Sequence, residues 1–266
     1  MSTSSHIVST LRAAGCVFAE DEARLLSDAA SGPEQLADMV ARRAAGLPLE
    51  HVLGWASFCG LRVAVDPGVF VPRRRTELLA WQAVKLASRG AVVVDLCCGS
   101  GAVAAVVART VPDADLYAVD VDPAAVRCAR RNVPGGQVYE GDLYAPLPDS
   151  LRGGVDVLVA NAPYVPTDAI GLMPPEARLH EPRVALDGGT DGLDVVRRVI
   201  ADAARWLAAG GHLLVETSEA QAPLLLEAAG KAGLRPHQVH DDDLGATMLV
   251  ARAPQDRTTV TRRTPA

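Results

Sequence analysis

The sequence contains few cysteines, and their arrangement excludes two common roles. There are five, an odd number, and their spacing is not that of a small disulfide-linked domain. Cys97 and Cys98 are adjacent, so they cannot form the Cys-x-x-Cys pair of a zinc site. We therefore expect a protein of a reducing compartment with no bound metal, in which Cys16, Cys59 and Cys128 fill buried apolar positions.

Lysine, aromatic residues and long apolar runs are also scarce. Only two lysines occur, aromatic residues make up 4%, and 32 acidic residues outnumber 26 lysines and arginines, for a net charge of -6. This balance gives no general attraction to a polyphosphate and argues against a protein that coats a nucleic acid duplex. No run of about 18 apolar residues occurs, and the chain does not begin with a basic segment followed by an apolar one. The expectation is a cytoplasmic protein with no membrane and no stable nucleic acid partner.

Apolar residues are plentiful enough to form a core. Hydrophobic residues make up 49% and charged residues 22% of 266, close to the usage of globular proteins. Residues 1–50 show the three- and four-residue spacing of short helices, with a break at Ser31-Gly32-Pro33. Residues 51–88 predict a hairpin followed by a helix over 78–86. Residues 254–266 are polar and lack periodicity, which predicts a disordered tail.

From residue 89 to 253, predicted strands alternate with predicted helices, which indicates an α/β fold with a mostly parallel sheet. The predicted strands are 91–96, 116–120, 137–140, 155–160, 212–216, 235–240 and 246–252. The predicted helices are 101–109, 123–132, 193–208 and 220–232. We interpret Gly210-Gly211 as the end of the third of these helices.

Residues 92–101, VVVDLCCGSG, form an apolar strand that leads into a glycine turn and a helix. Gly99 and Gly101 allow the backbone to approach a ligand closely, and the helix N-terminus offers unpaired N–H groups. A dinucleotide site needs Gly-x-Gly-x-x-Gly, which Gly99, Gly101 and Ala104 nearly satisfy. Asp95 at the strand end better suits a cationic ligand such as S-adenosylmethionine, whose amino and sulfonium groups are positive.

Acidic residues also end the next strands. Asp120 closes the second strand, where a carboxylate can accept hydrogen bonds from both ribose hydroxyls of an adenosine. Asp122 precedes Pro123 and a helix, which favours a helix N-cap over a ligand. Asp142 is predicted to accept from the adenine amino group, with Leu143 as an apolar wall, and a solvated loop acid is the alternative for Asp142.

Residues 157–164, VLVANAPY, include the end of the fourth strand. The run resembles the Asn-Pro-Pro-Tyr motif of amino-methylating, S-adenosylmethionine-dependent methyltransferases, with Ala162 at the position of the first proline. The resemblance implies that the Asn161 side-chain oxygen and the carbonyl of residue 162 accept both N–H groups of a planar, poorly nucleophilic nitrogen. It further implies that Tyr164 packs its ring on the target and that Pro163 stiffens the turn, with no need for a metal or a histidine base.

Motifs outside this loop resemble one branch of these enzymes. Residues 70–77, FVPRRRTE, look like the Pro-Arg-Pro-x-Thr-Glu connector of the HemK/PrmC-type protein (glutamine-N5) methyltransferases, with Arg74 replacing the second proline. Residues 181–193, EPRVALDGGTDGL, match that family's Glu-Pro, Ala-Leu and glycine-rich stretch. Cys97 and Cys98 stand where the family more often has small residues such as Gly and Thr. The chain is thus similar to a divergent member of this family over nearly its whole length.

The resemblance implies a fold, a cofactor and a substrate. The fold is a seven-stranded, Rossmann-like class I S-adenosylmethionine-dependent methyltransferase domain at 89–253 with a reversed last strand, after a helical substrate-docking domain at 1–50 and a connector at 51–88. The implied substrate and partner is the Gly-Gly-Gln glutamine of a peptide-chain release factor. The predicted catalytic residues are Asn161, Ala162, Pro163 and Tyr164. The predicted cofactor-binding residues are Asp95, Cys97, Cys98, Gly99, Ser100, Gly101, Asp120, Asp142, Leu143 and Asn161.

Three alternatives stay open. A nucleic-acid adenine-N6 methyltransferase would use the same loop on a flipped base, although the acidic charge and few aromatics argue against it. A non-catalytic relative would bind S-adenosylmethionine but would have lost transfer through Ala162. A dinucleotide oxidoreductase lacks recognisable hydride-transfer residues. Separately, Arg73, Arg74 and Arg75 form either a solvated face or a substrate-binding edge.

Overall fold

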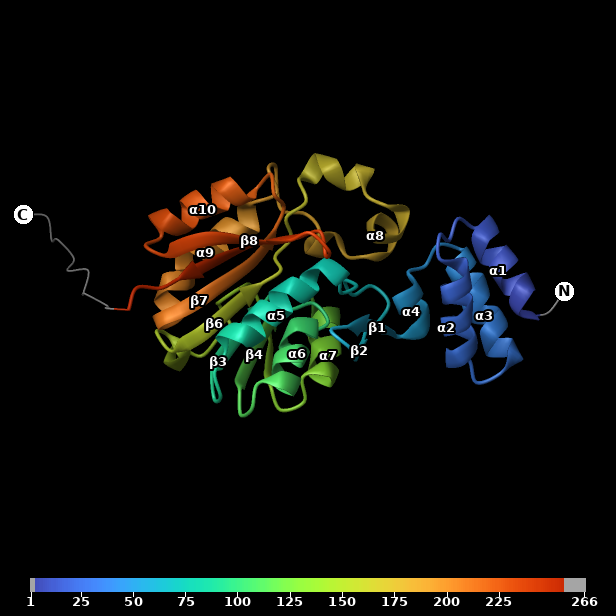
Figure 1. Cartoon of the computed structure of the whole chain (residues 1–266), viewed down its shortest axis with the longest axis horizontal. Coiled ribbons are helices and arrows are strands. Elements are labelled where there is room, and N and C mark those ends of the chain that lie inside the picture. The colour runs from blue at the N-terminus through green and yellow to red at the C-terminus, as the bar shows by residue number, and fades with distance from the viewer. Residues whose placement is uncertain (1–2, 256–266) are drawn as a thin grey trace, which may run out of the picture.

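Four helices form the N-terminal part of the computed structural model, which describes residues 3–255. They are α1 (Thr3–Ala13), α2 (Ala19–Ala29), α3 (Pro33–Ala44) and α4 (Leu49–Leu53). Leu11, Leu26 and Met39 are buried in a small core of their own. Figure 1 shows α1, α2 and α3 at one end of the molecule, away from the sheet. Residues 256–266 of the predicted tail lie outside the described residues.

A connector joins this bundle to the main domain. Its hairpin consists of β1 (Trp55–Phe58) and antiparallel β2 (Leu61–Ala64), and it is followed by the 3-10 turn η1 (Arg74–Thr76) and α5 (Glu77–Leu86). A turn follows the hairpin, in which the Val69 N–H donates to the Asp66 carbonyl. No helix of the described residues is long and apolar enough to cross a membrane.

The main domain is built on one seven-stranded sheet, as predicted. Its strands, in the order they lie side by side, are β5 (Gln137–Glu140), β4 (Asp115–Asp120), β3 (Val92–Leu96), β6 (Val155–Ala160), β7 (Leu207–Thr217), β9 (Ala246–Arg252) and β8 (Arg235–Asp241). Strand β9 is antiparallel to both of its neighbours, whereas the pairs from β5 to β7 are parallel. The expected α/β class and reversed last strand are therefore confirmed.

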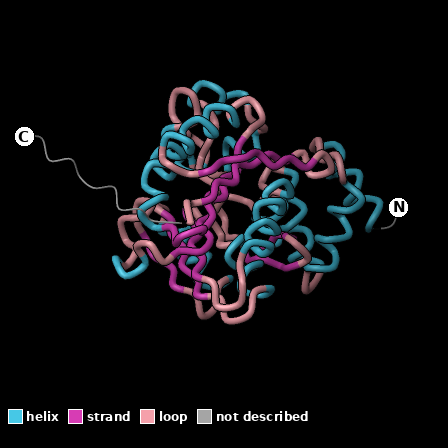
Figure 2. The backbone as a smooth tube through the Cα atoms, turned by 60° about the vertical axis from the view of Figure 1, so that its left-hand side comes forward, coloured by secondary structure: helices cyan, strands magenta, loops and turns pink. Residues whose placement is uncertain are grey.

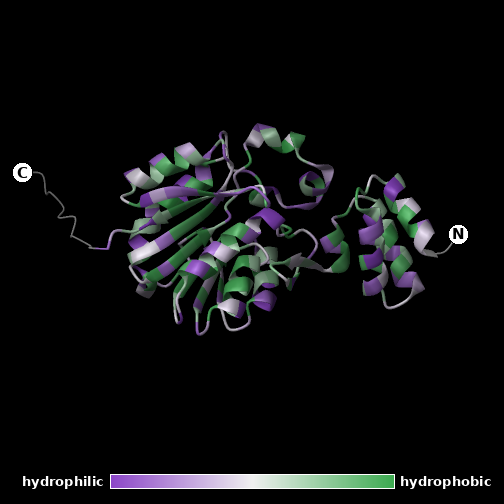
Figure 3. Ribbon diagram, in the orientation of Figure 1, coloured by the Kyte–Doolittle hydropathy of each residue, from purple (hydrophilic) through white to green (hydrophobic). Residues whose placement is uncertain are grey.

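Helices cover both faces of this sheet because successive strand side chains point to opposite faces. Val94 and Leu158 belong to the core shared with α9 (Asp194–Trp206) and α10 (Ala222–Lys231). Val93 and Val157 belong to the core shared with α5 and α6 (Ala102–Thr110). Helix α7 (Pro123–Asn132) packs beside β4 and β5. Figure 2 shows the strands running together between the helices, and Figure 3 shows how apolar these strands are.

One local prediction is wrong. Helix α9 ends at Trp206, and Gly210-Gly211 lie inside β7 rather than at a helix end. Val155 pairs with Leu207 and Val157 pairs with His212, so the glycines belong to an irregularity that adds residues to β7. Gly210 has φ +74°, and a Cβ on Gly211 would lie 2.7 Å from the Val155 carbonyl oxygen, which explains why glycines occupy both positions.

One cysteine also differs from expectation. Cys16 and Cys128 are buried as predicted, but Cys59 is only half-buried. It lies in the hairpin turn with φ +49°, where the chain reverses at the edge of the main domain.

The segment between β6 and α9 contains short helical turns that the sequence analysis did not predict. These are η3 (Thr167–Leu172), α8 (Pro175–His180) and η4 (Arg183–Ala185). Glu176 of α8 pairs with buried Arg43 of the N-terminal bundle at 2.7 Å. Glu181 accepts hydrogen bonds from the Val71 N–H and from Arg73 of the connector. All three parts of the chain therefore meet at this segment.

Candidate active site

Strand β3 ends in the glycine turn that the sequence predicts. Gly99 and Gly101 have φ of +54° and +76°, a region in which residues with a side chain are strained. A Cβ at Gly101 would lie 3.0 Å from that of Ala129, so the turn packs closely on α7. A Cβ at Gly99 would meet nothing within 4 Å, so its backbone faces open space. The turn is thus fixed on one side and accessible on the other.

Asp95 and Asp120 hold this turn in place. The Asp95 carboxylate accepts a hydrogen bond from the Ala104 N–H in the first turn of α6 at 3.2 Å. Asp120 accepts from the N–H groups of Gly99 at 2.8 Å and Asp122 at 2.9 Å, one on each oxygen. An ionised carboxylate has about four lone-pair positions, so Asp120 can accept further hydrogen bonds. Asp122 caps α7 through the Ala124 N–H, as predicted.

The two carboxylates lie in surroundings that disfavour negative charge. Burial raises the pKa of Asp95 to about 7, and the nearby Asp120 charge adds to this effect. Burial also raises the pKa of Asp120. A cation bound beside them would favour both ionised forms, whereas a pyrophosphate would not. The electrostatics of the turn therefore favour the cationic ligand over the dinucleotide.

The adjacent cysteines differ in backbone conformation. Cys97 has φ +54°, the left-handed region, although it carries a side chain. Burial raises the pKa of both the Cys97 and the Cys98 thiols, so both stay protonated at neutral pH. They act here as small apolar side chains on the cavity wall.

Asp142 and Leu143 also line the cavity, but Asp142 is not free. Its carboxylate forms an exposed ion pair with Arg198 of α9. Leu143 is buried and has φ +49°. The predicted apolar wall thus lies where expected, and the carboxylate predicted to accept from adenine is shared with an arginine.

The loop after β6 places Asn161 at the opposite side of the cavity. The Asn161 Nδ2 donates to the Thr76 Oγ1 at 3.4 Å, a long hydrogen bond that leaves the amide oxygen available to accept. Ala162 is 1% exposed and packs in the sheet core, and Pro163 follows it, also buried. The substitution of proline by alanine at 162 therefore keeps a buried backbone with its carbonyl intact.

Tyr164 completes this loop. Its hydroxyl donates to Oε1 of the buried Glu216 carboxylate at 3.2 Å, and this Glu216 oxygen also accepts from the Arg75 Nε at 3.3 Å. Burial, followed by the Glu216 charge, raises the pKa of Tyr164 to about 12. Tyr164 is thus a neutral phenol that donates a hydrogen bond at physiological pH.

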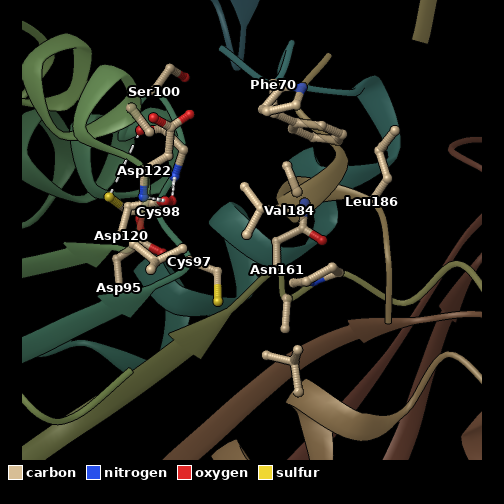
Figure 4. Close-up of a pocket in the computed structure, with 18 of the residues that line it drawn as sticks. Phe70, Asp95, Cys97, Cys98, Ser100, Asp120, Asp122, Asn161, Val184 and Leu186 are labelled. Atoms are coloured by element: carbon tan, nitrogen blue, oxygen red, sulfur yellow. Dashed lines mark hydrogen bonds between the residues drawn. The ribbon is translucent and has the colours of Figure 1, made fainter. Parts of the chain in front are cut away.

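One cavity brings these groups together, and Figure 4 shows them as two facing walls. The glycine wall consists of Asp95, Cys97, Cys98, Gly99, Ser100, Asp120, Asp142 and Leu143. The asparagine wall consists of Phe70, Arg73, Arg75, Thr76, Asn161, Ala162, Pro163, Tyr164, Val184 and Leu186. Of the predicted site residues, only Gly101 does not line the cavity, and its role is to allow the turn to pack on α7.

The arginine run contributes to the asparagine wall. Arg73 and Arg75 pair with the buried carboxylates of Glu181 and Glu216, and both arginines line the cavity. Arg74 and Arg75 are exposed, and Arg73 is half-buried. The two arginines therefore fix the asparagine wall to the segments around residues 181 and 216.

Sequence reasoning missed Glu216 and Gln221. Gln221 donates to the Tyr164 carbonyl at 3.0 Å. The one available signal is that Glu216 ends an otherwise apolar predicted strand, and Gln221 carries no signal of its own. Within residues 3–255, no group of three or more His, Cys, Asp or Glu side chains is placed to hold a metal ion.

Comparisons with known proteins point to one family. The family model for the methyltransferase small domain matches residues 60–173. A release factor glutamine methyltransferase from Mycolicibacterium smegmatis is 43% identical over 216 residues, 78% of this chain and 76% of that protein. A 4-amino-L-phenylalanine/4-methylamino-L-phenylalanine methyltransferase from Streptomyces pristinaespiralis is 39% identical over 213 residues, 75% of this chain and 72% of that protein.

A solved structure supports the fold. The T. thermophilus 16S rRNA N2 G1207 methyltransferase, in complex with AdoMet and guanosine, superposes with a TM-score of 0.55 at 23% identity, covering 75% of this chain and 49% of that one. Fold and site together define a class I S-adenosylmethionine-dependent methyltransferase. Within that class, the chain belongs to the release factor glutamine methyltransferase family.

Proposed function

We propose that this chain transfers a methyl group from S-adenosylmethionine to the side-chain amide nitrogen of a protein glutamine, and that the glutamine is that of the Gly-Gly-Gln loop of a peptide-chain release factor. The observation that carries the proposal is the position of Asn161. Its amide nitrogen is occupied by Thr76, and it shares one cavity with the carboxylates of the glycine wall. The family's activity on release factors supports the choice of substrate.

The glycine wall fits the cofactor. Asp95 is buried and Asp120 is half-buried, and their carboxylates provide negative charge for a cationic ligand. The open backbone at Gly99 lets that ligand approach closely. In this proposal Asp120 binds the ribose hydroxyls, and Leu143 contacts the adenine, near Asp142. S-adenosylmethionine, when bound, supplies an electrophilic methyl group.

The asparagine wall prepares the acceptor nitrogen. An amide nitrogen is a poor nucleophile because its lone pair is delocalised into the carbonyl. The Asn161 amide oxygen and the Ala162 carbonyl accept its two N–H groups, which favours the pyramidal nitrogen of the transition state. Tyr164, with its hydroxyl held by Glu216, presents its ring to the acceptor. Phe70 lies on the same wall and limits the orientations that the side chain of the substrate glutamine can adopt.

The direct test is methyl transfer to the release factors of the source organism. Mass spectrometry of the Gly-Gly-Gln peptide reads the product, beside a release factor in which that glutamine is alanine. We expect methylation confined to the one glutamine. Methylation of the Gln→Ala protein, or none on either protein while the cofactor still binds, would contradict the proposed substrate.

A second acceptor class has its own support. The 39% identical relative is named for an aryl amine substrate, and the asparagine wall carries the Phe70 and Tyr164 rings, which suit a flat aromatic amine. The same assay therefore includes 4-amino-L-phenylalanine and an adenine-containing oligonucleotide as separate acceptors. Transfer only to the oligonucleotide would identify an adenine-N6 enzyme.

A cytoplasmic location accompanies the release factor proposal, and five free cysteines support it.

A further inference from the structure

Tyr164 is held at both of its polar ends by residues from one short segment. Its hydroxyl donates to Glu216, the next-to-last residue of β7, at 3.2 Å. Its backbone carbonyl accepts from the Gln221 side chain, just before α10, at 3.0 Å. The side chain and the backbone of Tyr164 are thus held by separate hydrogen bonds. The first restrains rotation of the ring, and the second restrains movement of the loop that carries it.

The nitrogen and the oxygen of the Gln221 side-chain amide both have hydrogen-bond partners. Its nitrogen also donates to the Asp191 carbonyl at 3.1 Å, and its oxygen accepts from the Ser218 hydroxyl at 2.8 Å. A Cβ on Gly192 would lie 2.3 Å from the Tyr164 carbonyl oxygen and 2.6 Å from the Gln221 Nε2. Glycine at 192 is therefore what permits this close approach, and no side chain fits there.

The other end of the loop is held from the connector. Asn161 donates to Thr76, and the neighbouring Arg75 donates to the same Glu216 oxygen as Tyr164 does. Glu216 is 3% exposed, and its second oxygen has no hydrogen-bond partner. The contacts with Tyr164 and Arg75 therefore stabilise its buried negative charge. The loop 161–164 is thus tied at its first and last residues.

We propose that Gln221 and Glu216 are positioning residues that hold the loop 161–164 rigid and so compensate for the alanine at 162. A proline there would restrict the backbone directly, whereas alanine leaves it free to move unless other contacts hold it. The kinetic part of this inference rests on the proposed function, but the effect on loop rigidity does not.

The test uses the full-length protein with S-adenosylhomocysteine bound. Gln221→Met removes both donors at similar length, Gln221→Glu also removes them, and Gln238→Glu on exposed β8 is the matched control. We expect amide hydrogen exchange of the peptide 158–166 to accelerate about tenfold in both Gln221 variants and in Glu216→Met, which removes the acceptor of the Tyr164 hydroxyl, with cofactor affinity within about twofold of wild type. The turnover number should fall about 10- to 100-fold.

Coupling to residue 162 distinguishes positioning from general damage. When Ala162→Pro is combined with Gln221→Met, the loss of turnover and the faster exchange should both shrink, because the proline supplies the lost restraint. Wild-type exchange in both Gln221 variants, or the same loss with and without the proline, would overturn the inference. If wild type methylates no acceptor, the proposed function fails, and the exchange measurements still decide whether the loop is held this way.

Discussion

The two walls of the cavity are built in different ways. The glycine wall comes largely from two strand ends and their turns, where Asp95 and Asp120 accept from backbone N–H groups nearby. The asparagine wall joins segments far apart in sequence, because Thr76, Asn161 and Glu216 meet through side chains. Local backbone geometry thus fixes the first wall, and long-range contacts fix the second. Substitutions should accordingly affect cofactor affinity at the glycine wall and turnover at the asparagine wall.

The largest effect should follow from Asn161→Ala. The alanine removes one of the two acceptors for the reacting nitrogen, so methyl transfer should fall by about 100- to 1000-fold. Cofactor affinity, measured by calorimetry, should stay close to wild type because the glycine wall is intact. Turnover at the wild-type rate would contradict the assignment of the site, and a parallel loss of cofactor binding would contradict the separation of the two walls.

A smaller effect, on binding, should follow from Asp120→Asn. The amide presents an N–H group toward the N–H of Gly99 or Asp122 and removes the charge, so the dissociation constant for S-adenosylmethionine should rise about 10- to 100-fold. Asp122→Asn is the matched control, since asparagine also caps a helix. Equal affinities for both variants by calorimetry would rule out the ribose role of Asp120.

The same contrast explains what the sequence could predict. Glycines, the acids at strand ends and the alternation of strands and helices are local signals, and they located the glycine wall and the sheet. The contact of Gln221 with the Tyr164 carbonyl depends on how α10 returns to the sheet, and no local pattern reports it. The prediction that Gly210 and Gly211 end a helix is wrong for the same reason. A helix end and an irregular strand both favour glycine, and only the pairing of β7 with β6 distinguishes them.

Cofactor binding should also depend on pH through the glycine wall. Burial raises the pKa of Asp95 to about 7, so below that pH this side chain is mostly protonated and no longer attracts a cationic ligand by its charge. Between about pH 5.5 and 7, where an α-amino group stays protonated, affinity should therefore increase with pH by at most about tenfold per unit. Calorimetry across this range should give a weaker slope for Asp95→Asn. A slope as steep as that of wild type would exclude Asp95 as its source.

The smallest effect concerns stability and separates the two adjacent cysteines. Cys97 has φ +54°, so Cys97→Gly should relieve backbone strain. This relief should outweigh both the greater freedom of glycine in the unfolded chain and the loss of the few contacts of the half-buried thiol. The free energy of unfolding should therefore increase, by at most about 0.5–1 kcal/mol. Cys98 is buried without a positive φ, so Cys98→Gly should instead cost about 1 kcal/mol or more through lost packing. Thermal unfolding of the two variants should therefore shift in opposite directions. Equal destabilisation by both would mean that the Cys97 side chain contributes more by packing than its backbone conformation costs.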